Sequence, residues 1–244
     1  MKIQWQKPLI DKRMIVVLLL EVLLLISSLA LYFDQQNSKL LQQVHDPVMT
    51  VFIGAMPDRF ASSQLWWLLL WVGFMSLPIF ICAGVTDAYQ RNLYTFLSLR
   101  MHRRLGAYIW PLKQVVLREA SLLLVMGIAV GTLTHFFLRT QQFGEAGLFI
   151  ILIIVSQTFL VVLEAVLQGY FGPMIGVVGT LTIIFLSFLQ MPLMPLRFAI
   201  GSTFATDPQL LGAIGYQIAL IILLLLIQLF YMPGRWGQYG TGRE

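Results

Sequence analysis

Residues 147–191 read GLFIILIIVSQTFLVVLEAVLQGYFGPMIGVVGTLTIIFLSFLQM, and Glu164 is the only charged side chain among them. A helix needs about 20 apolar residues to cross the hydrocarbon core of a membrane. The stretch holds two such runs, 147–167 and 173–191, with only residues 168–172 between them. So short a connection predicts two antiparallel membrane-spanning helices that pack side by side.

The rest of the chain continues this pattern. Of its 244 residues, 58% are hydrophobic and 11% are charged, whereas a soluble domain is about 25% charged. Because so few charged side chains cannot cover a water-exposed surface, a soluble globular protein is excluded. The apolar runs predict an all-α polytopic membrane protein, one domain over residues 1–244. Its six spans are expected at 14–33, 65–85, 119–138, 147–167, 173–191 and 212–232.

Lysine and arginine fall unevenly around these spans. With the N-terminus inside, 12 of them lie on the cytoplasmic side and 4 lie outside. Since cytoplasmic loops carry the excess of Lys and Arg, the count predicts that both termini are cytoplasmic. Trp66, Trp67 and Trp71 would then mark the outer interface of the second span, where tryptophans are enriched. The first run is too long for the core of a signal peptide and contains Glu21, so we expect a retained span.

Residues 86–118 form the longest predicted cytoplasmic connection. Leu93, Phe96 and Leu97 recur there at helical spacing among arginines, a pattern typical of a helix that lies along a membrane surface. The segment could anchor the loop to anionic lipid, or it could dock a cytoplasmic partner through its aromatic and basic side chains. The residues of that surface are Tyr89, Arg91, Leu93, Tyr94, Phe96, Leu97, Arg100, Arg103 and Arg104.

Two predicted outer connections contain apolar pieces interrupted by proline. One lies between Pro47 and Pro57, and it is too short to span. The other precedes the last span, where Pro192, Pro195 and Pro208 favour short, broken helices. We therefore expect re-entrant or interfacial segments on the outer side.

Polar side chains also occur inside the predicted spans or directly after one, at Glu21, Gln157, Glu164, Gln168, Gln217 and Gln228. Glu164 shares a helical face with Gln157 and Gln168, because residues seven and four apart lie nearly in line. A charged side chain at the bilayer centre costs about 3 kcal/mol, so we expect Glu21 and Glu164 to point inward. The set could line a translocation path or form a hydrogen-bonded seam that changes during transport. It could equally be static polar contact between helices.

Common catalytic and metal-binding motifs are missing from the sequence. It contains no G-x-x-x-x-G-K-[ST] phosphate loop, so we expect any ATPase to be a separate chain. His45, His102 and His135 lack metal-ligand spacing, and Cys82 is the only cysteine. No nucleophile and base accompany the membrane carboxylates. We therefore expect neither an enzyme nor a bound cofactor or metal, and no contact with nucleic acid.

The layout resembles the permease subunit of a type 2 ATP-binding-cassette exporter. The matching parts are six spans with both ends inside, the basic segment from Arg91 to Arg104, and the outer segment MPLMPLRFAIGSTFATDP at 191–208. Among such permeases, the chain is similar to small bacterial ones that serve antimicrobial-peptide export or immunity.

This resemblance implies a multi-pass protein of the bacterial cytoplasmic membrane that transports an amphipathic peptide or lipid-like substrate. It also implies a coupling helix within 86–118 that docks a cytoplasmic ATPase carrying ATP-Mg, and a second permease subunit, identical or related. The alternative is a standalone membrane immunity or scaffolding protein without ATP coupling. For that protein, the basic loop would touch only lipid.

Overall fold

The structure is a computed structural model that describes residues 12–34, 62–83, 143–189, 191–200 and 206–239, together with single positions between 113 and 124. Every regular element in these residues is helical, which confirms the all-α prediction. The elements are α1 (Lys12–Asp34), α4 (Ser62–Cys82), α8 (Phe143–Phe171), α9 (Pro173–Leu186), α10 (Asp207–Tyr239) and the short 3-10 helices η3 (Ser187–Leu189) and η4 (Arg197–Ala199).

Two of these helices are long and apolar enough to cross a membrane, over Gly147–Phe171 in α8 and Asp207–Gln228 in α10. The other helices hold shorter apolar stretches, Ile15–Leu24, Leu68–Phe80 and Pro173–Leu189. Most of the predicted third span and all but a few positions of the loop 86–118 lie outside the described residues. The six-span topology and its orientation stay predictions.

The outside of the helix bundle is apolar. Leu23 is 59% exposed, Met174 is 78% exposed, and large aliphatic side chains of α10 such as Ile222 are also exposed. A soluble monomer rarely shows a continuous apolar surface of this kind. Such an exterior is typical of helices that contact lipid.

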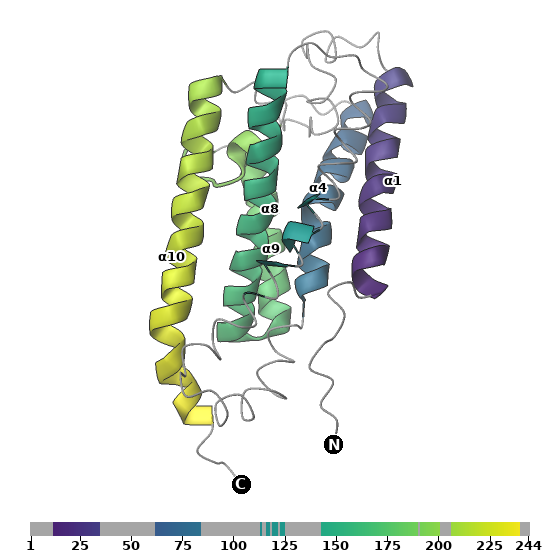
Figure 1. The fold of residues 1–244 in the computed structure, drawn as a ribbon. Coiled ribbons are helices and arrows are strands. Elements are labelled where there is room, and N and C mark those ends of the chain that lie inside the picture. Colours follow the sequence, from purple (N-terminus) through teal and green to yellow (C-terminus); the bar gives the residue numbers. More distant parts are fainter. Residues whose placement is uncertain are drawn as a thin grey trace.

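Helix α8 lies at the centre of the described bundle. It packs against α10, α9 and α4, while α1 packs on the far side of α4 (Figure 1). Trp71, Met75, Leu152 and Ile184 are among the fully buried side chains at these contacts. Because three helices surround α8, polar side chains on any of its inward faces meet protein rather than lipid.

A tight turn joins α8 to α9. Gly172 adopts a φ of 94°, which favours glycine, and Pro173 begins α9 at a position where its missing N–H costs nothing. A Cβ on Gly176 would lie 3.1 Å from the backbone nitrogen of Gln168, so the two helices approach closely there. The prediction of an antiparallel pair is confirmed, although α8 extends to Phe171 and leaves Gly172 alone as the connection.

Helix ends differ from the predicted spans most clearly in α10 and α9. The predicted last span ends at residue 232, but α10 begins at Asp207 and continues past Pro233 to Tyr239. The predicted fifth span reaches residue 191, but α9 ends at Leu186 and tightens into η3. Hydrophobicity marks the part of a helix that lipid can cover, whereas backbone hydrogen bonds decide where the helix ends.

Candidate functional site

Buried polar side chains lie along α8 and α10, where Ser156 faces Gln217, Gln157 faces α4 and Gln168 lies against α9. These side chains are at most 4% exposed, and we name them the polar row: Ser156, Gln157, Glu164, Gln168, Gln217 and Gln228. Helices α8 and α10 run in the same direction, with α9 opposite to both (Figure 1). We call the end at which α10 begins the outer end, following the predicted orientation.

The outer part of the row joins α8 to α10. Ser156 donates its hydroxyl to the carbonyl of Leu152 at 2.7 Å, and the Gln217 amide nitrogen donates to Ser156 Oγ at 2.9 Å. The same amide nitrogen also donates to the carbonyl of Pro195 at 2.5 Å. Since an amide nitrogen carries two hydrogens, Gln217 uses both of them.

The middle of the row joins α8 to α4. Gln157 Nε2 donates to the carbonyl of Phe74 at 3.4 Å. Four residues further along α4 stands Pro78, which has no N–H and cannot make the helical bond to that carbonyl. The side chain of Gln157 therefore supplies a donor at the place where proline removes one.

The inner part of the row is less well satisfied. Gln168 donates to Glu164 Oε1 at 3.2 Å, but Glu164 Oε2 and Gln228 Oε1 are buried without a hydrogen-bond partner among the described residues. Gln168 and Gln228 lie twelve and eleven residues beyond the Ser156 and Gln217 pair, about 18 and 16 Å along their parallel helices. Within the described bundle, two buried acceptors without donors therefore lie in the inner half, one on α8 and one on α10.

Two further buried carboxyl groups are not members of the polar row. Glu21 on α1 and Glu119 are each 1% exposed, and Glu119 lies within electrostatic range of Glu21. Both carboxylate oxygens of Glu119 and Oε2 of Glu21 lack a hydrogen-bond partner in the part of the chain that the structure describes. In the same part, no three His, Cys, Asp or Glu side chains could hold a metal ion.

No protein-family model matches the chain, and no curated protein or solved structure matches it significantly.

The structure places all six predicted polar residues in the interior. Gln157, Glu164, Gln168, Gln217 and Gln228 belong to the polar row, whereas Glu21 on α1 is not a member of it and lies within electrostatic range of Glu119. The nine residues of the predicted docking surface, Tyr89 to Arg104, lie outside the described residues.

Sequence reasoning missed three residues of these polar contacts. It took Trp71 for an interfacial tryptophan, but that side chain is 2% exposed and donates to the carbonyl of Ala199 at 3.0 Å. Glu119 stands at the edge of an apolar run, where a carboxylate usually reaches water. Ser156 is a small polar residue of a type that usually serves helix packing. The one sequence signal beside it is the polar side chain of Gln157.

Proposed function

We propose that this chain is the transmembrane permease subunit of a type 2 ATP-binding-cassette exporter in the bacterial cytoplasmic membrane. It would move an amphipathic substrate, a peptide or lipid-like molecule, out of the cell or the membrane. The energy would come from ATP-Mg bound to a separate cytoplasmic ATPase. The observation that supports this proposal is the buried polar row inside a bundle whose exterior is apolar.

The polar row suits a moving helix contact. Ser156 and Gln157 are neighbours on α8, yet one bonds to α10 and the other to α4. Amides and hydroxyls can exchange one partner for another, or for water, when helices shift. Glu164 Oε2 and Gln228 Oε1 already have acceptor capacity that a polar group could fill.

The composition of the row favours an amphipathic substrate over a small ion. Glu164 is its only ionisable side chain, and the others are amides and one hydroxyl. A path for a small ion generally presents several fixed charges or carbonyl rings. Long apolar walls with a few amides instead match a molecule that is itself apolar on one side and polar on the other.

Energy would enter through the basic helix predicted within 86–118. Closure of the ATPases would push this coupling helix and shift the two spans on either side of it, the first of which is α4. A shift of α4 would act directly on the Gln157 to Phe74 bond. A second permease subunit, identical or related, would supply the other wall of the path.

Gentle detergent purification of the tagged protein from its native membranes tests the proposal. We expect a cassette ATPase to co-purify and the eluate to hydrolyse ATP. A folded protein that repeatedly emerges without an ATPase would contradict the exporter and favour the standalone immunity or scaffolding protein.

A variant can test the docking surface separately. Replacing Leu93, Phe96 and Leu97 by serine should abolish ATPase association, while Ser98→Asn in the same segment should leave it intact. Retained association in a properly inserted triple variant would show that the ATPase docks elsewhere.

A further inference from the structure

Residues 191–200, here named the strap, lie between η3 and the start of α10 in the sequence and hold only the short helix η4. The backbone bonds of the strap are local turns. Met194 N–H donates to Met191 O at 3.0 Å, Arg197 N–H to Met194 O at 3.2 Å, and Ala199 N–H to Leu196 O at 3.0 Å. The strap therefore keeps its own shape through these turns.

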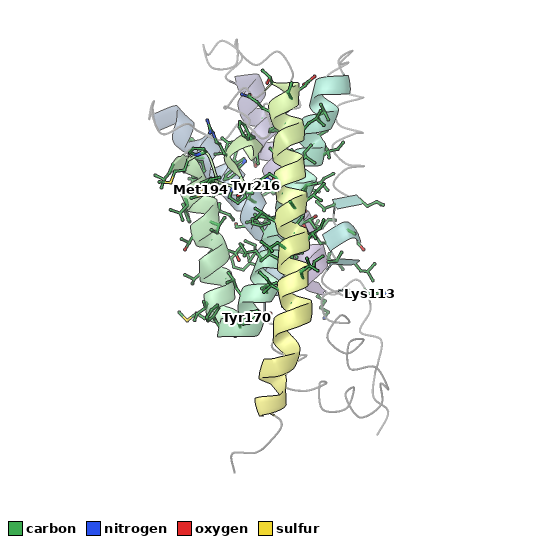
Figure 2. All side chains as sticks on the ribbon, turned by 90° about the vertical axis from the view of Figure 1, so that its left-hand side faces the viewer. Lys113, Tyr170, Met194 and Tyr216 are labelled. Carbon is green, nitrogen blue, oxygen red and sulfur yellow. The ribbon has the colours of Figure 1, made fainter. Side chains whose placement is uncertain are left out.

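Side chains from two helices tie the strap to the bundle. Trp71 Nε1 on α4 donates to the carbonyl of Ala199 at 3.0 Å. On α10, Tyr216 donates its hydroxyl to the carbonyl of Leu193 at 3.1 Å, and Gln217 Nε2 donates to the carbonyl of Pro195 at 2.5 Å. Figure 2 shows Met194 of the strap close to Tyr216.

The strap lies within the bundle and not beyond its outer end. Trp71 and Tyr216 are each nine residues from the start of their helices, at Ser62 and Asp207. Nine residues of helix correspond to about 13 Å. At this depth the strap has two faces, because Leu193 is 76% exposed while Leu196 is fully buried.

Gln217 belongs both to the strap contacts and to the polar row. Its amide nitrogen holds the Pro195 carbonyl and the Ser156 hydroxyl at the same time. We infer that the strap closes the outer end of the polar row and that Gln217 is its latch, the side chain whose hydrogen bonds hold it closed. The strap opens as a unit while α8 stays packed in the bundle.

The chemistry of the contacts supports an opening of this kind. The three tethered carbonyls and the Gln217 amide can all bond to water once they separate. The N–H groups of Met194, Arg197 and Ala199 donate to carbonyls inside the strap, so opening of the strap as a unit can keep these bonds. Opening would also expose Leu196, Ala199 and Ile200, which are at most 1% exposed, so apolar packing adds to the hydrogen bonds that hold the strap closed.

Cysteine labelling of the full-length chain in lipid nanodiscs measures this opening without an ATPase. In a Cys82→Ala background, Ala199→Cys reports on the buried side of the strap, and Ala165→Cys reports on the interior of α8. Both alanines are at most 1% exposed. We expect Gln217→Leu to speed maleimide labelling at position 199 about tenfold, and Tyr216→Phe to speed it about threefold, because each removes hydrogen bonds to the strap.

Gln228→Leu is the matched control, since it removes a buried amide from α10 that does not touch the strap. It should leave the labelling of position 199 unchanged, and position 165 should stay unlabelled in every variant. Equal labelling of position 199 in Gln217→Leu and its parent would overturn the latch. So would a parallel rise at position 165, or an equal effect of Gln228→Leu. If Gln217→Leu does not fold, Tyr216→Phe decides by the same criteria, and neither result bears on whether an ATPase binds.

Discussion

Gln157 on α8 donates a hydrogen bond from its side-chain amide to the carbonyl of Phe74 on α4. Pro78 has no N–H and cannot donate the helical hydrogen bond to this carbonyl. In water such a carbonyl would be solvated, but inside an apolar bundle a donor must come from the protein. The proline of one helix and the glutamine of another are therefore linked through one backbone atom. This link ties the centre of the polar row to the helix that would precede the coupling loop.

We expect a double-mutant cycle to detect this link. Gln157→Leu should lower the free energy of unfolding by about 1 kcal/mol, a typical value for a polar contact between membrane helices. In a Pro78→Ala background the same change should cost less, because the restored backbone N–H at position 78 can bond to the carbonyl of Phe74. Denaturant unfolding in detergent, followed by tryptophan fluorescence, measures both values.

Thr158→Val is the control for this cycle. The Thr158 hydroxyl donates to Ile154 of its own helix at 2.9 Å, so its loss should be additive with Pro78→Ala. If Gln157→Leu is equally additive, the link does not exist.

The close approach of α8 and α9 predicts a sharp difference between two glycines. Gly176→Ala should destabilise the protein by about 1 to 3 kcal/mol, because its Cβ would meet the backbone of Gln168. At Gly215 on α10, no atom of the described residues lies within 4 Å of an added Cβ. Gly215→Ala should therefore raise stability by about 0.5 to 1 kcal/mol through helix propensity. Thermal unfolding in the same detergent compares them, and similar losses for both variants would refute the close contact.

The buried position of Trp71 gives a third prediction. Trp71→Phe keeps an aromatic ring beside Phe188, whose centroid lies 5.1 Å away, but it removes the bond to Ala199. We expect a loss of about 1 kcal/mol in the free energy of unfolding. Trp66 is 59% exposed, so Trp66→Phe should change stability by less than about 0.5 kcal/mol. If Trp66→Phe lowers the free energy of unfolding more than Trp71→Phe does, Trp71 has the interfacial role expected from its sequence position.

A functional role for Glu21 predicts a loss of transport without a loss of folding. Glu21→Gln replaces the ionisable carboxyl group by a neutral amide and keeps the size of the side chain. In vesicles with the ATPase, export should fall about tenfold, equivalent to ~1.4 kcal/mol on the activation barrier. Ser27→Ala on the same helix, whose hydroxyl bonds locally to Leu23 at 2.8 Å, should export normally. Normal export by a well-folded Glu21→Gln variant would contradict a role of Glu21 in transport and leave it a role in packing alone.

Much of the helix arrangement follows from the sequence. The apolar runs located α1, α4, α8, α9 and α10 to within several residues, because lipid-length hydrophobic segments have no stable conformation in a membrane other than a helix. The inward placement of Glu164 and Gln217 also follows, since polar groups facing lipid are costly.

The partners of these groups could not be predicted. Trp71 looked interfacial because three tryptophans cluster at one end of a run, yet its depth depends on where the strap enters the bundle. Glu119 stands at the edge of an apolar run beside Arg118, yet its side chain is 1% exposed and lies within electrostatic range of Glu21 on α1. Each of these facts concerns two segments that are distant in sequence.

The sequence by itself determined that the chain is an apolar helical protein with a few polar side chains turned inward, because hydrophobicity and helical periodicity act along one segment at a time. Only the tertiary structure decided that Gln217 bonds to both Ser156 and Pro195. It also decided that Gln157 donates to the Phe74 carbonyl, which receives no helical hydrogen bond from Pro78. Hydrogen bonds need atoms within about 3 Å, and only the packing of helices from distant parts of the chain brings such atoms together.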